Sequence, residues 1–354
     1  MDVFAPIIER KHEQVCFCYE ESAGLRCIIA IHDTTLGPAL GGVRIWNYAT
    51  EEDAFMDALR LSKAMTYKAA VAGLGLGGGK AVILCDPKQK TEALMRAFGR
   101  FVDTLGGRYI TAEDVNSSVE DMEYVLAETK HVCGIPVSRG GSGDPSPLTG
   151  FGVWHGIKAT CEVAFGTNEL NGVRVAVQGL GKVGFFLCKH LKADGAHVIG
   201  SDIDPERCEH AQKELGIELC GPQDIIEQDC DVLAPCALGG VINDKSLPKL
   251  RCKVVAGGAN NQLAEERHGA ALEERGILYA PDYVINAGGL INVYCEIDGY
   301  NQDRALRMCT TIRQSLKTVY QIAKAEKITT AEAAKRMAIR RIESIRKLRR
   351  LRKA

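Results

Sequence analysis

The sequence predicts an α/β protein of two domains, and three observations support this prediction. The chain has 354 residues, of which 46% are hydrophobic, which is enough for two separate cores. Strand-like apolar runs alternate with helical patterns in both halves. Between the halves, residues 139–147 form the densest run of Gly, Ser and Pro, which is typical of a hinge. We therefore expect an N-terminal α/β domain followed by a doubly wound α/β domain.

The N-terminal half has the apolar spacing of both element types. Thr50 followed by three acidic residues is typical of an N-cap and an acidic first turn, so a helix is expected to begin there. Ser117 and Glu120 are expected to cap a later helix in the same way. The expected strands are 25–32 and 80–84, and the expected helices are 51–70, 91–105 and 118–128.

A glycine-rich segment, residues 73–79, precedes Lys80 and the apolar run after it. An amine placed there would be partly desolvated, which favours the neutral form that acts as a base. A P-loop is excluded because Leu74 stands where that motif needs Gly, and Ala81 where it needs Ser or Thr. The alternative is a glycine-rich turn with a solvated lysine.

Lys68 is the second lysine of interest. It follows Ala64 by four residues and Leu61 by seven, so it shares the apolar face of the expected helix. A lysine at a helix end often extends its amine to solvent, which is the simpler interpretation. The alternative is that Lys68 and Lys80 converge on one anionic substrate.

A phosphate-binding motif opens the second half. The strand-like run 173–178 leads into Gly179-Leu180-Gly181-Lys182-Val183-Gly184, a helix follows, and a second strand ends at Asp202. In this context the glycines permit a tight turn and close approach of a pyrophosphate. Asp202 is placed for ribose hydroxyls and favours NAD over NADP, because it would repel a 2′-phosphate. The alternative is a Rossmann-like domain that binds no nucleotide.

Composition excludes several classes of protein. No apolar run approaches the roughly 20 residues of a membrane span, and the first residues lack a signal-peptide pattern, so a cytoplasmic protein with no membrane partner is expected. The 14 cysteines include no CxxC pair and the histidines no HxxxH spacing, so reduced thiols and no metal are expected.

The C-terminal segment is basic. Residues 335–353 carry ten Lys or Arg and one acid, Glu343. Apolar residues at roughly helical spacing predict a packed terminal helix with a basic outer face; they are Met337, Ile339, Ile342, Ile345 and Leu348. Nucleic-acid binding is the alternative, but no recognition module supports it and no nucleic-acid partner is expected.

Six motifs in order along the chain resemble the amino acid dehydrogenases, most closely the leucine dehydrogenase branch. They are residues 37–42, 65–68, 77–80, 111–114, 145–147 and 286–289. The resemblance implies a substrate domain over 1–138 completed by C-terminal helices at about 325–354, a hinge at 139–150 and a Rossmann-type NAD-binding domain over 148–324. It also implies a homo-oligomer, octameric in the leucine enzymes.

The resemblance also implies an activity, the NAD-dependent, reversible oxidative deamination of leucine, isoleucine and valine to the 2-oxo acid and ammonia. By the same resemblance Lys68 binds the substrate carboxylate, Lys80 is the general base and Asp114 exchanges protons with the amino group. The substrate pocket would include Leu40, Gly41, Gly42, Ala112 and Leu290. Thr149, Cys236, Ala237 and Asn261 would lie near the nicotinamide, and residues 179–184 around the pyrophosphate.

Two departures from the leucine pattern leave alternatives open. Asp144 stands where asparagine is expected, and Leu290 where valine is expected. Some phenylalanine enzymes carry leucine at the second position, so phenylalanine dehydrogenase is the first alternative, although Ala112 matches the leucine type. Glutamate is disfavoured because Leu40 replaces the lysine of glutamate enzymes. A remote alternative is a non-catalytic NAD-binding protein with a nucleic-acid-binding tail.

Overall fold

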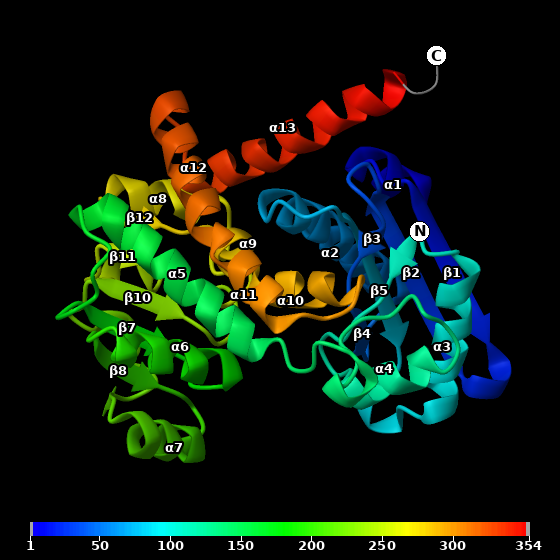
Figure 1. Cartoon of the computed structure of the whole chain (residues 1–354), viewed down its shortest axis with the longest axis horizontal. Helices are drawn as coiled ribbons and strands as arrows, with labels where there is room; N and C mark the ends of the chain where they lie inside the picture. The colour runs from blue at the N-terminus through cyan, green and yellow to red at the C-terminus, as the bar shows by residue number, and fades with distance from the viewer. Residues whose placement is uncertain (1–2, 352–354) are drawn as a thin grey trace. The chain divides into compact units, whose positions relative to one another are not determined.

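The computed structural model describes residues 3–351 and divides into two compact units (Figure 1). The first unit contains the residues up to Asp144, Asn292–Gln302 and the residues from Ala338 on; the second contains Pro145–Ile291 and Asp303–Met337. The division falls within helices α10 (Gly288–Glu296) and α13 (Thr330–Leu351). We had instead expected all residues from about 325 to belong to the first domain.

The first unit is built on a mixed sheet of six strands. Their order is β1-β2-β5-β3-β6, and β4 also pairs with β5. β1, β2 and β5 are antiparallel neighbours, whereas β3 and β4 run parallel to β5. The strands are β1 (Gln14–Glu20), β2 (Leu25–Asp33), β3 (Ala39–Leu40), β4 (Val43–Trp46), β5 (Gly77–Leu84) and β6 (Tyr109–Ile110).

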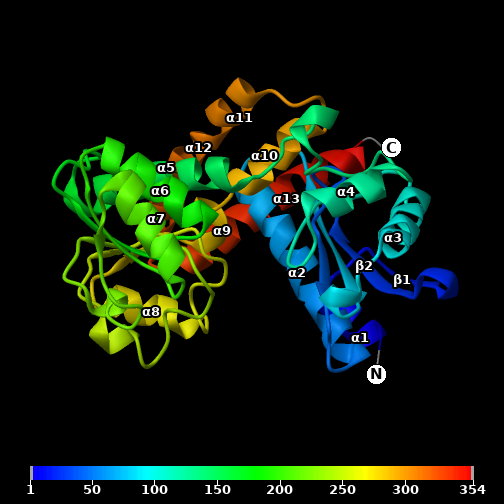
Figure 2. The same ribbon diagram turned by 90° about the horizontal axis from the view of Figure 1, so that it is seen from below.

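Helices cover both faces of this sheet. α1 (Phe4–Arg10) and α2 (Glu51–Val71) lie on one face, and α3 (Glu92–Thr104) and α4 (Val119–Leu126) on the other (Figure 2). Successive side chains of β2 alternate accordingly: Ile28 packs with α2, whereas Ile29 packs with α3 and α4. Because both faces are buried, residues 27–31 of the strand are continuously apolar rather than alternating.

The first helix cap agrees with the sequence, and the second does not. The Thr50 hydroxyl accepts the N–H of Asp53 and begins α2, as predicted. The prediction that Ser117 and Glu120 cap the next helix is wrong, because Ser118 and Asp121 form the capping box of α4. Ser117 is used elsewhere, since its hydroxyl donates to the carbonyl of Val43.

The second unit is a parallel sheet in the order β12-β11-β10-β7-β8-β9. The chain starts in the centre at β7, builds outward to β9, then returns to β10 on the other side. This is the doubly wound order with a switch point between β7 and β10, so the predicted fold class is confirmed. The strands are β7 (Arg174–Gln178), β8 (His197–Ser201), β9 (Glu218–Leu219), β10 (Val232–Pro235), β11 (Val254–Val255) and β12 (Leu278–Tyr279).

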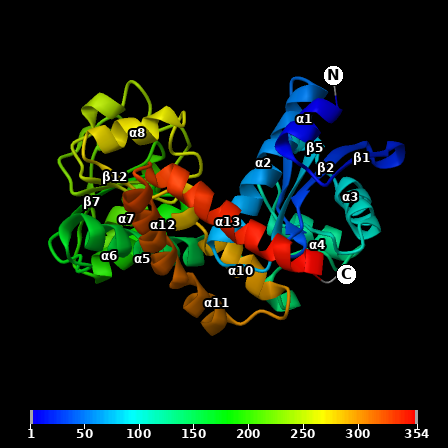
Figure 3. The same cartoon turned by 90° about the horizontal axis from the view of Figure 1, so that it is seen from above.

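Helices of the second unit pack on its sheet and on each other; α5 contacts both α6 and α12 (Figure 3). The helices not yet given are α5 (Ser146–Phe165), α6 (Lys182–Ala193), α7 (Pro205–Leu215), α8 (Arg267–Glu274), α9 (Asp282–Ile285), α11 (Gln302–Cys309) and α12 (Thr311–Glu326). Short 3-10 turns occupy Glu21–Ala23, Pro87–Gln89, Val137–Arg139, Ile225–Glu227 and Leu247–Lys249.

The basic C-terminal helix packs onto the first unit through arginines. Arg341 donates to the carbonyl oxygens of Ala70 and Leu74, at 2.8 and 2.9 Å, and so binds the carbonyl end of α2. Ile342 is buried as the apolar spacing predicts, whereas Leu348 is exposed. The basic residues 352 and 353 lie outside the described residues.

No helix within residues 3–351 combines the length and apolarity needed to cross a membrane. All fourteen cysteines are free thiols, as expected from their scattered positions.

Candidate functional site

Gly77, Gly78 and Gly79 belong to strand β5, so the expectation that they form a loop before the strand is wrong. A Cβ on Gly78 would lie 2.1 Å from the backbone nitrogen of Thr66 in α2, and one on Gly79 would lie 2.6 Å from the Tyr109 ring. The glycines therefore let α2 and β6 approach the strand. Lys80 is the first residue of β5 that carries a side chain.

Gly41 and Gly42 are needed for a similar reason. A Cβ on Gly41 would lie 1.7 Å from the carbonyl oxygen of Gly79, and one on Gly42 would lie 2.3 Å from that of Glu113. The two glycines thus bring the turn between β3 and β4 against the strand that carries Lys80 and against the segment that carries Asp114. Glycine at these positions serves backbone packing beside the site.

Lys80 and Asp114 form a buried ion pair. The Lys80 Nζ donates to Asp114 Oδ2 at 2.5 Å, and Lys80 is 5% exposed. Burial lowers the pKa of Lys80 below its usual value, although the Asp114 carboxylate acts in the opposite direction. Burial alone would raise the pKa of Asp114, but Lys80 and Arg44 outweigh it and the net shift is downward. The pair thus combines a lysine whose pKa is lowered with a carboxylate whose pKa is also lowered and which therefore stays charged at neutral pH.

Arg44 is a third member of this centre, and sequence reasoning missed it. Its Nε lies 3.1 Å from Asp114 Oδ2, and its Nη1 lies 3.0 Å from Asp57 Oδ2. The positive charge of Arg44 also lowers the pKa of Lys80. The available signal was an arginine between two buried apolar residues of a strand, Val43 and Ile45.

The segment that carries Asp114 is held from several sides. The backbone N–H of Asp114 donates to Ser117 Oγ at 2.8 Å, and Ser117 Oγ donates to the carbonyl of Val43 at 2.8 Å. Asn116, in a left-handed conformation with φ +63°, donates from its side chain to the carbonyl of Ile45. These bonds tie the Asp114 turn to β4, the strand that supplies Arg44.

The other predicted substrate residues are distributed over both units. Lys68 is half-buried on α2, which packs directly against β5, so it lies on an element in contact with that of Lys80. Leu40 is 2% exposed and pairs with Gly78 and Ile110. Ala112 is buried in the first unit, and Leu290 is buried in the second.

In the second unit, the glycine-rich turn follows β7 and opens α6. Gly179 has φ +97°, and a Cβ on Gly184 would lie 1.9 Å from the carbonyl oxygen of Gly179, so both positions require glycine. Gly181 precedes the first turn of α6, and no side chain caps that turn. An uncapped helix N-terminus beside a glycine turn suits an anionic pyrophosphate.

Asp202 directly follows β8, beside this turn. Its carboxylate accepts the N–H of Leu180 at 2.7 Å and that of Asp204 at 3.0 Å, and its side chain is 6% exposed. Sequence reasoning missed Arg207, whose Nε lies 3.2 Å from Asp204 and whose Nη1 lies 3.8 Å from Asp202. The charge of Asp202, which was expected to repel a 2′-phosphate, and that of Asp204 are therefore partly neutralised by a guanidinium.

Two buried polar atoms at the strand ends fit a bound dinucleotide. Gln178 Oε1 and Ser201 Oγ, which end β7 and β8, have no hydrogen-bond partner within the described part of the chain. Such atoms are costly when buried and unpaired, so a polar ligand at this edge would satisfy them. The residues present therefore fit a nucleotide.

Of the residues expected near the nicotinamide, Cys236, Ala237 and Asn261 lie on loops of the second unit, whereas Thr149 lies in the first turn of α5. The thiol sulfur of Cys236 accepts the N–H of Gly258 at 3.4 Å, and burial raises its pKa to about 11, so it stays protonated. The Ala237 methyl lies beside Gly179. Thr149 Oγ1 donates to the carbonyl of Pro145 at 2.8 Å, and Asn261 is exposed with φ +52°.

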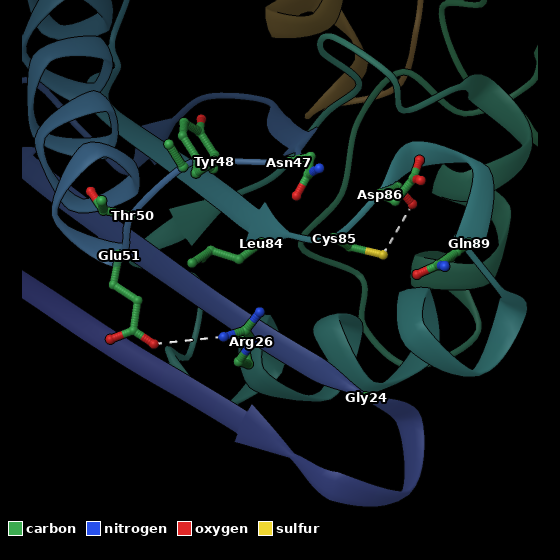
Figure 4. A pocket seen from close by; sticks show the side chains of 11 residues that line it. Gly24, Arg26, Asn47, Tyr48, Thr50, Glu51, Leu84, Cys85, Asp86 and Gln89 are labelled. Carbon is green, nitrogen blue, oxygen red and sulfur yellow. Dashed lines mark hydrogen bonds and ion pairs between the residues drawn. The ribbon is translucent and has the colours of Figure 1, made fainter.

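A polar cavity of about 560 Å³ lies where β4 and β5 end and α2 begins (Figure 4). Arg26 and Glu51, which form an ion pair across it at 3.6 Å, and Tyr48 are among its lining residues. Lys80 and Asp114 do not line this cavity. It touches their network only through Tyr48, whose hydroxyl donates to Asp57 at 2.8 Å.

Asp244, Glu265 and His268 come close enough together to hold a cation. Arg267, however, pairs with Asp244 at 2.6 Å and with Glu265 at 2.9 Å. Its guanidinium already supplies the positive charge that these carboxylates require.

A doubly wound sheet with a glycine turn is typical of a dinucleotide-binding protein, and a buried lysine beside a carboxylate is typical of an enzyme site. Two family models match the chain. One is described as Glu/Leu/Phe/Val dehydrogenase, dimerisation domain, over residues 12–131. The other is Glutamate/Leucine/Phenylalanine/Valine dehydrogenase, over residues 140–204 and 206–350. The chain belongs to this family of amino acid dehydrogenases.

Individual relatives are similar over nearly their whole length. A leucine dehydrogenase from Thermoactinomyces intermedius is 53% identical over 350 residues, which cover 99% of this chain and 96% of the relative. A phenylalanine dehydrogenase from the same organism is 45% identical, covering 99% and 96%. The crystal structure of L-tryptophan dehydrogenase from Nostoc punctiforme superposes with a TM-score of 0.87 at 46% identity, covering 97% of this chain and 99% of that one.

Proposed function

We propose that the protein catalyses the NAD-dependent, reversible oxidative deamination of leucine, isoleucine and valine to the corresponding 2-oxo acids and ammonia. The observation that carries the proposal is the buried pair of Lys80 and Asp114, in which the pKa of the lysine is lowered. This chemistry needs a base near neutral pKa and a group that moves protons on nitrogen. Membership of the amino acid dehydrogenase family supports the same reaction.

The proposed roles follow from charge and burial. Lys68 binds the substrate carboxylate. Bound NAD would supply the acceptor for the hydride that leaves Cα of the amino acid. Neutral Lys80 takes a proton from water, which adds to the iminium carbon, and the lysine ammonium then polarises the carbonyl oxygen as it forms. Asp114 carries protons to and from the substrate nitrogen, which leaves as ammonia.

The cofactor would be held by the turn of residues 179–184 and by Asp202. The uncapped start of α6 supports pyrophosphate binding, and the buried Asp202 carboxylate supports binding of ribose hydroxyls. Thr149, Cys236, Ala237 and Asn261 are proposed to surround the nicotinamide. Cys236 takes no part as a nucleophile, because burial keeps its thiol protonated.

The substrate side chain is proposed to meet Leu40, Ala112 and Leu290, with Gly41 and Gly42 beside it. The three larger residues are apolar and buried, so a charged side chain would lose its hydration without gaining a partner. Each buried methylene of the substrate contributes about 0.8 kcal/mol, which favours leucine and isoleucine over alanine. Phenylalanine is the second candidate, because Leu290 occurs in some enzymes of that type.

Assembly and location are part of the proposal. The model that matches residues 12–131 describes a dimerisation domain, which supports a homo-oligomer, and we propose an octamer in the cytoplasm. Light scattering of the purified chain measures the subunit number.

The test is a spectrophotometric panel with NAD and, separately, NADP. Leucine, isoleucine, valine, phenylalanine, tryptophan and glutamate are each assayed, with a reaction lacking amino acid as the blank. We expect the highest kcat/KM for one of the three aliphatic substrates with NAD. A higher kcat/KM for an aromatic substrate or glutamate, or no turnover of any amino acid, contradicts the proposal.

A further inference from the structure

We propose that Arg44 is a positioning residue that orients the Asp114 carboxylate and allows Lys80 to lose its proton, and that Asp57 and Tyr48 fix Arg44 for this task. The inference deepens the proposed function and rests on it, because its readout is turnover of an amino acid.

Arg44 connects two carboxylates through one guanidinium group. Its Nε contacts Asp114 Oδ2 at 3.1 Å and its Nη1 contacts Asp57 Oδ2 at 3.0 Å. The Arg44 side chain is only 22% exposed, so water screens these contacts weakly. A planar guanidinium held at two points cannot turn without breaking one of the bonds.

Asp57 is itself fixed by three donors. Tyr48 donates its hydroxyl to Asp57 Oδ2 at 2.8 Å, and Arg60 donates to Asp57 Oδ1 at 2.7 Å. The third donor is Arg44. With both oxygens occupied and 15% of its side chain exposed, Asp57 is a rigid anchor on α2 for the guanidinium.

The contacts at Asp114 select one oxygen for the substrate. Within residues 3–351 the side chains that donate to this carboxylate, Lys80 and Arg44, both bind Oδ2. The backbone of Asp114 is held separately by Ser117. Oδ1 is therefore the oxygen available to a substrate amino group, and 24% of the Asp114 side chain is exposed. Without Arg44, the carboxylate would be held by Lys80 alone.

The charges explain why a second cation is needed. A general base must become neutral, but loss of the Lys80 proton would leave a buried Asp114 carboxylate without a counter-ion, which is costly. Arg44 stays charged at all relevant pH values and retains the pairing. Three cations, Lys80, Arg44 and Arg60, face two carboxylates, Asp57 and Asp114. These five groups together therefore become electrically neutral when Lys80 loses its proton.

The charged groups around Lys80 come from three elements. Asp114 follows β6, Arg44 comes from β4 and Asp57 from α2. Arg44 lowers the pKa of Lys80, and the two carboxylates raise it. Lys68 and Glu113 are further charged residues on adjacent elements. Removal of the Arg44 charge should therefore raise the pKa of Lys80. Activity should then begin to rise only at higher pH.

The experiment compares the pH dependence of leucine deamination in the full-length protein and in Arg44→Gln. We expect kcat at neutral pH to fall about tenfold or more, and the ascending limb of kcat/KM to move up by about one pH unit, with partial recovery at alkaline pH. Arg44→Lys, which keeps the charge but cannot bridge both acids, should lower kcat with the limb close to that of the unchanged protein. Arg96→Gln, which removes the ion pairs of Arg96 with Glu92 and Glu128 at the surface of α3, is the matched control.

The outcomes separate this inference from the proposed function. If the unchanged protein turns over no amino acid, the proposed function fails whatever Arg44 does. If it is active and folded Arg44→Gln keeps the original pH limb, Arg44 has only a structural role and the inference is overturned. Thermal melting and NAD binding establish that each variant is folded. If Arg44→Gln does not fold, Arg44→Lys decides: unchanged kcat overturns the inference, and lowered kcat with an unmoved limb supports it.

Discussion

Lys80 Nζ and Asp114 Oδ2 lie 2.5 Å apart although the two residues are 34 positions apart in the sequence. Glycines at positions 41, 42, 78 and 79 make this meeting possible, because each lets a neighbouring backbone or ring approach where a Cβ would collide. The pair is therefore a product of close backbone packing around β5. Its chemistry and the packing around it can be tested separately.

Lys80→Ala should reduce turnover by about 10² to 10⁴, which is the usual effect of removing a general base. Binding of NAD should be unchanged, because the proposed cofactor residues are in the second unit. Lys68→Ala should chiefly raise KM for the amino acid. Steady-state kinetics and a fluorescence titration with NAD measure both effects, and near-native kcat in Lys80→Ala would rule out this residue as the base.

Asp114→Asn should move the pH dependence in the direction opposite to Arg44→Gln. The Asp114 carboxylate raises the pKa of Lys80, so its removal should lower that pKa further below the usual 10.5. The residual activity should then rise at lower pH than in the unchanged protein, although kcat falls with loss of the proton carrier. A pH–rate profile of both proteins measures this, and a limb displaced to higher pH contradicts the assigned electrostatics.

The same pair makes a predictable contribution to stability. The pKa of Asp114 is lower in the folded than in the unfolded chain, so its contribution is present above the usual value of 3.8 and is lost as pH falls through the folded pKa. The pKa of Lys80 is also lowered by folding, so its contribution increases as pH rises through the folded pKa toward 10.5. Asp114→Asn should remove the first contribution and Lys80→Met the second. The measurement is the free energy of unfolding of each protein as a function of pH.

The parts of the fold that depend on short-range patterns were predictable. Thr50 begins α2 because its own hydroxyl accepts an N–H three residues later, and the glycine-rich segment 179–184 leads from β7 into α6 as expected. These features need no information from distant residues. The same holds for the position of Asp202 directly after β8.

Three features depend on distant contacts and escaped prediction. Gly77–Gly79 extend β5 because Thr66 and Tyr109 pack on them. Arg44 is defined by carboxylates 13 and 70 positions away. Ser117 is drawn from its expected cap to the carbonyl of Val43, 74 positions away. In each case the partner becomes a neighbour only when the sheet forms.

Gly78→Ala tests the packing around β5. Its Cβ would lie 2.1 Å from the backbone nitrogen of Thr66, so α2 must shift, and we expect a loss of about 3 kcal/mol or more in the free energy of unfolding. Gly269→Ala is the matched control, since its Cβ would meet only Leu263 at 3.5 Å and Ala331 at 3.9 Å. That residue lies within α8, where alanine should stabilise by about 0.8–1 kcal/mol. Denaturant titration measures both changes.

Ala112→Gly tests the side-chain pocket and should shift selectivity from leucine toward phenylalanine. Ala112 is 4% exposed, and we infer that its methyl group crowds an aromatic ring at the pocket base. Hydrophobic pockets separate similar apolar substrates by only about 10 to 200-fold, so some activity on phenylalanine is expected even before the change. Removing the methyl should lower the ratio of kcat/KM for leucine to kcat/KM for phenylalanine. The aromatic ring would gain room, whereas the leucine side chain would lose its contact with the methyl group.

Ala97→Gly, on helix α3 of the same unit, is the control. It should lower stability without changing the ratio, because Ala97 lies away from Lys80 and Asp114, among the core residues of the opposite sheet face. The measurement is kcat/KM for both amino acids with NAD. A ratio that moves equally in both variants, or toward leucine in Ala112→Gly, would show that Ala112 does not limit substrate size.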